Sequence, residues 1–279
     1  MRKDIFRKLV NKTMKYLFSL ILFLLLFVGI GRMNAQVLHT ESFSVIIDTS
    51  KRIKGSIVPD FKFQNQKKDL IEFENTSDIS FRFKNHAITF ANKIELSKYG
   101  SEVLLSGGYL YVEYRKIFEE EFSLEPYSQL HWSDARGLEF KYAGGIQARY
   151  HILQNRKLGI FFGLGPFYEF ERWNYDGVKD HLLPANTKKI GSEKIKIGSY
   201  ISFKWISDFD LTFDFSAYHQ STLNEFFSTP RLASSTSITY NFTDNLGLLL
   251  KYENIYDYNP IVPIDKLFNK IIFTIDISF

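Results

Sequence analysis

Two pairs of residues have side-chain types and a spacing that could support nucleophilic chemistry. His131 and Ser133 stand two positions apart, and so do His219 and Ser221. Residues two apart on a β-strand share a face, so each imidazole could lie beside the hydroxyl that it would deprotonate. A working triad also needs a third group that orients the imidazole. Whether either pair could react therefore depends on the elements that carry it.

Other reactive or ligand-binding patterns are absent from the sequence. The chain has no cysteine, which excludes a thiol nucleophile, a disulfide framework and a zinc ribbon. Its six histidines are scattered, and none stands at a metal-ligand spacing. The segment Gly163-Leu164-Gly165 lacks the following helix that a nucleotide-binding loop requires. A net charge of +4 gives no nucleic-acid signature. We therefore expect no catalytic residue, no metal, no cofactor and no nucleic-acid partner.

The first 35 residues have the pattern of an export signal. Basic residues crowd Met1–Lys15, and the next segment, Tyr16–Ile30, is almost wholly apolar. A small residue, Ala35, then stands before Gln36. This order is typical of a cleavable signal peptide over residues 1–35. An uncleaved anchor is the alternative, although a spanning helix needs roughly 20 apolar residues. In both cases the rest of the chain leaves the cytoplasm.

Beyond the leader, polar and apolar residues alternate with the period of a β-strand. In Leu138–Ile152, for example, Leu138 and Phe140 share one face while Glu139 and Lys141 share the other. A helix, with its period of 3.6, would mix the two sets. Twelve segments show the alternation, some strongly and some weakly: Ile53–Gln64, Leu70–Phe83, Ala87–Ser97, Gly107–Arg115, Phe122–Ser133, Leu138–Ile152, Gly159–Trp173, Ile190–Trp205, Leu211–Ser221, Leu232–Phe242, Leu246–Tyr256 and Lys270–Phe279.

The connections between these segments favour a membrane barrel. Bacterial barrels have an even number of strands, with short turns at one end and longer loops at the other. The tight connections are Lys84–His86, Lys116–Glu120, Leu153–Lys157, Ile206–Asp210 and Thr243–Asn245. The intervening ones include the longer Trp173–Lys189, Asn224–Arg231 and Asn259–Leu267 and the short Asn65–Asp69 and Asp134–Gly137. The last segment ends on an aromatic residue, Phe279, as bacterial barrels do when they present themselves to the insertion machinery.

A soluble β-sandwich or jelly roll is the alternative fold, because it alternates in the same way and buries the apolar face in a core. Aromatics near strand ends favour a membrane interface instead: Trp132, Tyr150, Trp173, Trp205, Tyr252 and Tyr256. Polar residues at apolar-face positions (Asn75, Ser77 and Asn92) weigh slightly against it. The composition, 17% aromatic with a mean hydropathy of −0.15, suits strands with one apolar and one polar face.

We therefore predict an all-β fold, a transmembrane antiparallel β-barrel of about 12 strands over residues 53–279. A short periplasmic extension over residues 36–52 would precede it. Within that extension, Glu41–Thr49 could be a separate periplasmic strand or could lead into the first barrel strand.

Four segments carry a family resemblance: Leu104–Arg115, Ser128–Tyr150, Gly159–Trp173 and Pro230–Ser235. In their loose aromatic and glycine patterns they resemble an uncharacterised outer-membrane barrel family, a domain of unknown function described as salt-induced outer-membrane protein-like, in its Bacteroidetes form. The resemblance covers most of the mature chain. It implies a barrel fold and a location in the cell outer membrane of a Gram-negative bacterium, and it transfers no functional residue.

The polar face, which would line the lumen, carries charges of both signs. They are Glu72, Glu74, Asp78, Arg82, Lys93, Glu95, Glu113, Arg115, Glu121, Glu125, Glu139, Lys141, Arg149, Glu169, Glu171, Lys194, Lys196, Lys204, Lys251 and Glu253. One interpretation is a narrow pore whose charged wall selects solutes. The other is a barrel closed by acids and bases that pair across the lumen, which the near-equal numbers of the two signs favour.

The strand register also separates the two His-x-Ser pairs. His131 and Ser133 follow the lumen face, whereas a barrel-type lipid hydrolase works on its lipid-facing wall. His219 and Ser221 continue the apolar face, but the phospholipase pattern has an Asn where Thr222 stands. The same face of the next strand offers no Asn or Asp to orient the imidazole.

The function predicted from the sequence is a small passive channel or a structural component of the outer membrane, without enzymatic activity. The alternatives are a lipid hydrolase that uses His219 and Ser221, and a binding or adhesion protein that acts through Trp173–Lys189 and Asn224–Arg231. Expected partners are outer-membrane lipids, small solutes and the barrel-insertion machinery.

Overall fold

The computed structural model describes residues 52–65, 68–119, 121–186 and 188–279. The predicted signal peptide (1–35), the segment Glu41–Thr49 and nearly all of the predicted extension (36–52) lie outside the described residues.

Twelve β-strands make up almost all of the described chain. They are β1 (Ile53–Gln64), β2 (Leu70–Phe83), β3 (His86–Tyr99), β4 (Glu102–Glu119), β5 (Phe122–Ser133), β6 (Leu138–Gln154), β7 (Leu158–Trp173), β8 (Ile190–Ile206), β9 (Leu211–Ser221), β10 (Arg231–Asn241), β11 (Leu246–Asp257) and β12 (Leu267–Ser278). Three short 3₁₀ turns, η1 (Asp134–Arg136), η2 (Asp180–Leu182) and η3 (Leu223–Glu225), lie in connections. None of the helices in the described ranges is long and apolar enough to span a membrane.

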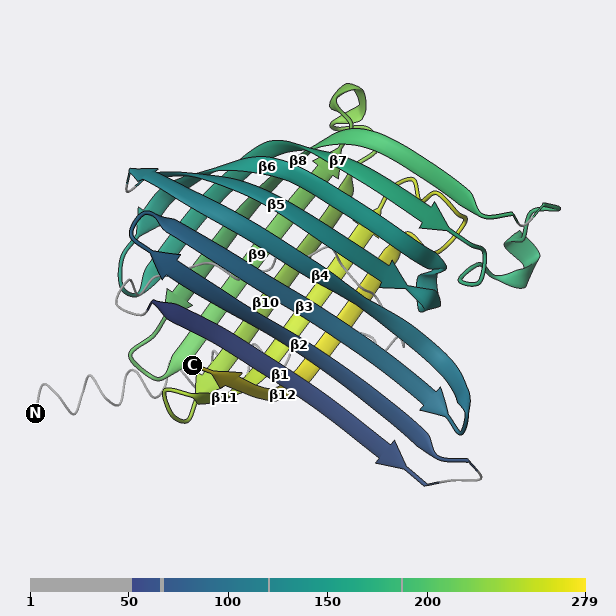
Figure 1. Cartoon of the computed structure of the whole chain (residues 1–279), viewed down its shortest axis with the longest axis horizontal. Coiled ribbons are helices and arrows are strands. Elements are labelled where there is room, and N and C mark those ends of the chain that lie inside the picture. The colour runs from purple at the N-terminus through teal and green to yellow at the C-terminus, as the bar shows by residue number, and fades with distance from the viewer. Residues whose placement is uncertain (1–51, 66–67, 120, 187) are drawn as a thin grey trace, which may run out of the picture. The chain divides into compact units, whose positions relative to one another are not determined.

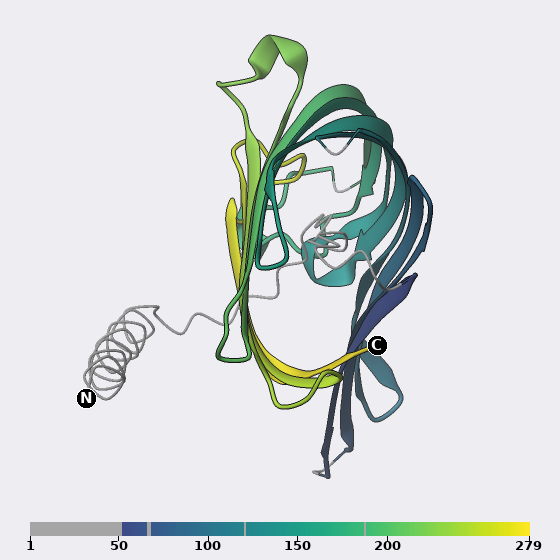
Figure 2. The ribbon, with the colours of Figure 1, turned by 90° about the vertical axis from the view of Figure 1, so that its left-hand side faces the viewer.

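The strands form one closed barrel. Each strand pairs antiparallel with its neighbours in the sequence, and β12 returns to pair with β1 (Figure 1). Seen from one end, the strands surround a lumen (Figure 2). The predicted fold class and the predicted number of strands are confirmed.

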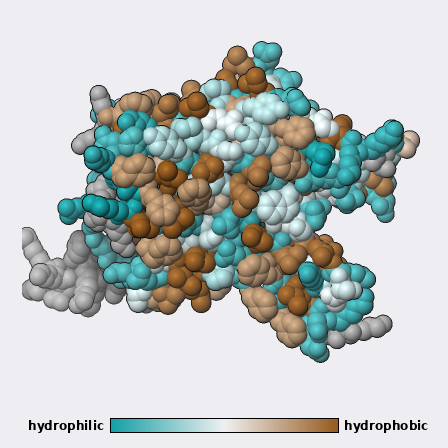
Figure 3. Space-filling view, in the orientation of Figure 1, coloured by the Kyte–Doolittle hydropathy of each residue, from teal (hydrophilic) through white to brown (hydrophobic). Residues whose placement is uncertain are grey.

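Alternation along each strand gives the wall two chemically different faces. On β7, Phe161, Phe167 and Glu169 are buried toward the lumen, whereas Phe162 and Leu164 point outward and are 42% and 44% exposed. Apolar residues spread over the outer wall in the same way (Figure 3). A sandwich would bury this apolar face, whereas here it is the outer surface, as a protein surrounded by lipid requires. The architecture is that of an outer-membrane β-barrel.

The connections differ between the two ends of the barrel. The end that holds both the start of β1 and the end of β12 has only short turns, for example at 84–85 and 155–157. The opposite end carries the long connections 174–189, 222–230 and 258–266. Since short turns mark the periplasmic side of such barrels, the long loops lie at the outer mouth.

The seam between β1 and β12 is the shortest strand pairing in the barrel. Gly55 and Phe279 exchange both backbone hydrogen bonds, and Ser56–Ser278 and Ile57–Ile277 stand opposite each other. In this register the hydrogen-bonded positions on β1 are Gly55, Ile57 and then Pro59. Pro59 has no N–H to donate. The pairing ends at Ile57–Ile277, and Figure 1 shows the two strands diverging beyond it. Pro59 is therefore the cause of the short seam.

Cysteine pairs placed across the seam should measure its length. The chain has no native cysteine, so introduced pairs react without background. We expect Ser56→Cys with Ser278→Cys to form a disulfide on mild oxidation, because opposite residues at a non-hydrogen-bonded position lie about 4.5 Å apart at Cα. Lys62→Cys with Ile272→Cys, in the same register nearer the outer mouth, should stay reduced. Free-thiol labelling of the folded barrel gives the readout, and efficient oxidation of both pairs would show a seam of full length.

Candidate functional site

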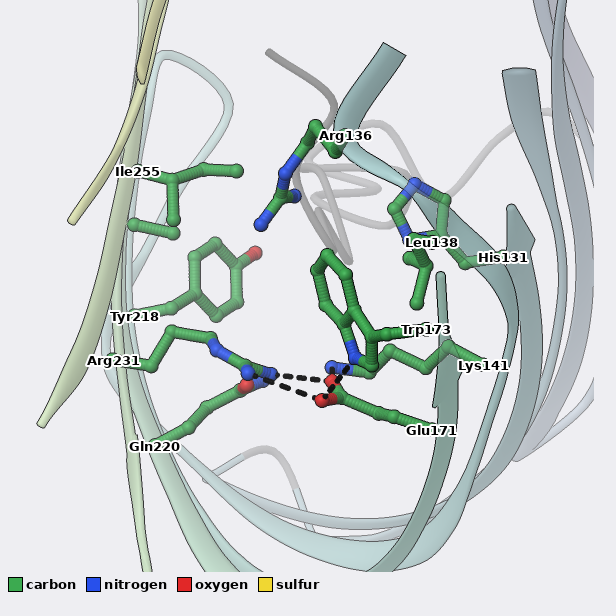
Figure 4. A pocket seen from close by; sticks show the side chains of 11 residues that line it. His131, Arg136, Leu138, Lys141, Glu171, Trp173, Tyr218, Gln220, Arg231 and Ile255 are labelled. Carbon is green, nitrogen blue, oxygen red and sulfur yellow. Dashed lines mark hydrogen bonds and ion pairs between the residues drawn. The ribbon is translucent and has the colours of Figure 1, made fainter. Parts of the chain in front are cut away.

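A layer of buried ion pairs crosses the lumen near the outer mouth. The Lys141 ammonium lies 2.5 Å from Glu169 and 2.7 Å from Glu171. From the far side, the Arg231 guanidinium reaches Glu171 at 2.8 Å, Glu169 at 3.2 Å and Asp257 at 2.9 Å. Arg231 is on β10 and both glutamates are on β7, with β8 and β9 between them. The contacts of Arg231 with the two glutamates therefore bridge the lumen (Figure 4), whereas Lys141–Glu171 and Arg231–Asp257 join directly paired residues of neighbouring strands. We call these five residues the outer charge layer.

A second charged group lies deeper in the lumen. Glu125 accepts from Arg115 at 2.5 Å and from Arg149 at 2.8 Å, and Arg115 also contacts Glu113 at 2.6 Å. The Tyr200 hydroxyl donates to Glu125 at 3.1 Å. All are almost fully buried, and they come from β4, β5, β6 and β8.

Gly163 makes room for the Tyr200 ring. A Cβ at this glycine would lie 2.0 Å from a ring carbon of Tyr200. The glycine therefore has a structural role here, because its missing side chain leaves the space that the Tyr200 ring fills.

A third charged group lies around β2, β3, β11 and β12. Glu74 contacts Lys270 at 2.5 Å and Lys93 at 3.0 Å, and Lys251 contacts Glu253 at 2.9 Å. Acids and bases of the lumen thus pair with each other, as the near-equal numbers of the two signs indicate. Some pairs reach over intervening strands, as Glu74–Lys270 does, and others follow the wall, as Lys251–Glu253 does. Such pairing is required of charges removed from water, because an uncompensated buried charge is strongly destabilising.

The periplasmic half of the lumen is hollow. A cavity of about 810 Å³ opens there, and its charged lining residues are Asp60, Glu74, Asp78, Asp210, Asp214, Asp244, Asp276, Lys54, Lys204 and Lys251. Seven carboxylates against three lysines make this vestibule acidic. Beside the outer charge layer, by contrast, the cavities measure only about 20 and 40 Å³. The lumen is therefore a funnel that narrows toward the outer mouth.

Apolar side chains from the loops cover the outer charge layer. Leu138, Trp173, Val178 and Val262 form one buried cluster, whose outer members come from the loops 174–189 and 258–266. The Arg136 guanidinium lies 5.4 Å from the Trp173 ring. Burial and the nearby Arg231 guanidinium lower the pKa of Arg136 to about 10, so it still carries its charge at neutral pH.

The predicted membrane-interface position of Trp173 is wrong. Its side chain is 2% exposed, and its indole N–H donates to Glu171 at 3.2 Å inside the lumen (Figure 4). Trp173 has the same parity on β7 as Glu169 and Glu171, which places it on the lumen face. Tyr150 and Trp205, 48% and 45% exposed on the outer wall, do lie where the sequence predicted them.

Two other predicted lumen charges lie elsewhere. Glu139 sits at a β-bulge between Leu138 and Phe140, and it contacts Arg172 and Lys189 instead of lumen groups. Glu121 is exposed in the turn between β4 and β5.

Sequence reasoning missed three residues that complete the charged groups. Arg231, Asp257 and Lys270 each lie at or beyond the edge of a predicted strand, and the structure extends those strands by one to three residues. Continuing the alternation outward would have found them, because Arg231 has the parity of Ser235 and Asp257 that of Glu253.

His131 and Ser133 lie in the lumen, as predicted, and both are buried. Neither ring nitrogen of His131 has a hydrogen-bond partner among the described residues. The ring lines the 20 Å³ cavity beside Arg136, Lys141 and Trp173 (Figure 4).

His219 and Ser221 share the outward face of β9, but the structure does not join them into a nucleophile and base. The His219 Nε2 atom donates to the Phe226 carbonyl at 2.8 Å, and the Ser221 hydroxyl donates to the Glu225 carbonyl at 2.8 Å. With Nε2 as the donor, Nδ1 is the acceptor, and it has no partner within the described chain. The third group that would orient a catalytic imidazole is therefore missing from the described residues. Among these residues, no group of His, Asp and Glu side chains is arranged to hold a metal ion.

Comparison with known proteins places this chain beside barrel channels at low sequence identity. No family model and no curated protein matches it. The NanC porin is 12% identical, with 81% of this chain and 98% of that one covered and a TM-score of 0.46. The KdgM porin is 10% identical, with 81% of this chain and 99% of that one covered and a TM-score of 0.45. The CymD monoaromatic hydrocarbon channel is 10% identical, with 81% of this chain and 87% of that one covered and a TM-score of 0.31.

Replacement of Arg231 should destabilise the barrel. Arg231→Ala leaves Glu169, Glu171 and Asp257 with fewer buried cations, a loss that typically costs about 3–5 kcal/mol. Arg172→Ala is the matched control, because the Arg172 side chain is 54% exposed and its ion pair is with Glu139, outside the outer charge layer. The control should cost no more than about 1 kcal/mol. The temperature at which the folded band disappears on unboiled gels compares the two variants, and equal midpoints would contradict the structural role of the outer charge layer.

Proposed function

We propose that this protein is a narrow passive channel of the outer membrane for small solutes, with a preference for cations. The observation that carries the proposal is the funnel, in which an acidic vestibule of about 810 Å³ leads to a narrow layer of ion pairs. A barrel that served only as a membrane scaffold could fill its lumen with apolar side chains. Charged lumen walls instead hold water and ions, and rings of carboxylates favour cations.

In this proposal the outer charge layer is the constriction. The Arg231 side chain spans the lumen, and small movements of long charged side chains would open a path for water and ions. The apolar cover around Trp173 and Val262 lies directly outside it. Flow would therefore be limited at the outer mouth and not in the vestibule.

Three further expectations belong to this proposal. Lipids of the outer membrane surround the apolar wall, and the insertion machinery recognises the last strand, which ends at Phe279. Membership in the salt-induced outer-membrane protein-like family is supported by the four segments named above. The absence of enzymatic activity is supported by the hydrogen bonds of His219 and Ser221, which hold backbone carbonyls and not each other.

Planar-bilayer recording of the refolded mature chain tests the channel. We expect small, steady single-channel steps from the native protein, with a reversal potential that shows cation preference. Arg231→Ala should give larger steps and a stronger cation preference, because it removes both bulk and positive charge from the constriction. Lys204→Ala, in the wide vestibule, should leave the step size unchanged. Silence of the native protein and of Arg231→Ala, with both correctly folded, would identify a permanently closed barrel.

A further inference from the structure

The His219 and Ser221 pair has a feature that a channel does not use. Both residues have the parity of the outward face of β9, where His219 lies opposite Leu232 of β10 and Ser199 of β8. Ser221 is nevertheless only 2% exposed. A residue on the lipid-facing side becomes this buried only when another part of the protein covers it.

The cover is the β9–β10 loop, residues 222–230. His219 holds it through the hydrogen bond to the Phe226 carbonyl, and Ser221 through the bond to the Glu225 carbonyl. The imidazole and the Phe226 ring also pack against each other, with centroids 4.3 Å apart and ring planes tilted by 48°. The loop is therefore held to the outer end of β9, where Ser221 also borders the small cavity beside the outer charge layer.

The loop has one polar and one apolar side. The Glu225 carboxylate accepts from Thr229 at 2.9 Å and from Thr222 at 3.3 Å, and these three residues border the mouth of the lumen. Leu223 and Phe227 are 71% and 90% exposed. Figure 1 shows the loop standing out beyond the wall strands, and in Figure 3 apolar residues gather at the same place.

The wall beside the loop continues the apolar surface. On β8, Ile197 stands opposite Ser221, and Ile195, one step nearer the outer rim, is 74% exposed. On β10, Leu232 is 41% exposed. The apolar side of the loop is thus continuous with the lipid-facing wall at its outer border.

We propose that residues 222–229 are a membrane anchor that inserts Leu223 and Phe227 among the lipids of the outer leaflet. The occupant of this apolar patch is lipid, because the patch extends a surface that lipid already covers. His219 and Ser221 are the clamp that turns the loop toward the bilayer. Aromatic side chains are favoured at this depth, where the hydrocarbon meets the headgroups.

Site-specific fluorescence tests the anchor, and the cysteine-free chain allows one label at a time. Phe227→Cys and Leu223→Cys carry an environment-sensitive dye in phosphatidylcholine vesicles, and quenching by nitroxide lipids is compared with quenching by aqueous iodide. Phe273→Cys, on the outer wall of β12, is the lipid reference, and Ala185→Cys, in the exposed 174–189 loop, is the water reference. Positions 223 and 227 should match the lipid reference, with emission shifted to the blue. Quenching that matches Ala185→Cys would overturn the proposal.

Two further variants test whether His219 holds the loop in place. Oxidation of an unlabelled variant then tests whether the patch contacts lipid or a second copy of the chain. His219→Ala should lower lipid quenching at position 227 while the barrel stays folded on unboiled gels. His86→Ala, which removes an outward imidazole bonded to Tyr114 at the other end of the barrel, should not. Unchanged quenching in His219→Ala would overturn the role of the clamp. Covalent dimers of unlabelled Phe227→Cys on oxidation in vesicles would instead identify the occupant as a second copy of the chain.

Discussion

The hydrocarbon core of a membrane offers no hydrogen-bond partner to a backbone N–H or C=O, and the rest of this structure depends on that constraint. A sheet can satisfy it only by closing on itself, and here β12 returns to β1 to close the ring. Closure then divides the residues of each strand into two alternating sets, one facing lipid and one facing the lumen. Apolar side chains must face lipid, so the charged residues of the spanning strands are directed into the lumen. The seam is a short pairing, where Pro59 removes a ladder donor.

The charged lumen is difficult to explain by stability alone. Buried ion pairs seldom stabilise a protein more than well-packed apolar residues of the same volume would, because both ions lose their water. Even so, Arg231 and Lys141 are held among three carboxylates where aliphatic residues could have filled the space. Under the proposed channel function, charges are kept at that cost because they can rearrange and admit water, which an apolar filling cannot. The pairs therefore hold opposite walls together and also close a path that an apolar filling would abolish.

Much of this arrangement could be predicted from the sequence, because a period of two is unambiguous over strands of a dozen residues. The fold, the strand number, the lumen position of His131 and the pairing of charges all follow from that period. The predictions from the sequence are wrong or incomplete where a bulge interrupts the alternation or where a strand runs past its predicted end. Glu139 falls in a bulge, which shifts its direction, and Arg231 and Asp257 stand just past the predicted strand ends. The type of residue predicts Trp173 at the membrane interface, whereas its alternation with its neighbours on β7 directs it into the lumen. The hollow vestibule, the apolar cover and the loop clamp could not be predicted, because they depend on distances between residues far apart in the sequence.

The long loops show how one physical requirement produces two different structures. Loops at the outer mouth carry apolar side chains that cannot all face water. In the loops 174–189 and 258–266, Val178 and Val262 turn inward, meet Trp173 and cover the constriction. In the β9–β10 loop the inward direction is occupied by Glu225 and its threonine partners, so the aromatic side chains turn outward. The outward strand residue at that point is a histidine, which offers a ring for Phe226 to pack against and an N–H for its carbonyl. A pair of residues whose spacing suggests hydrolysis thus has a simpler explanation in the direction that one loop takes.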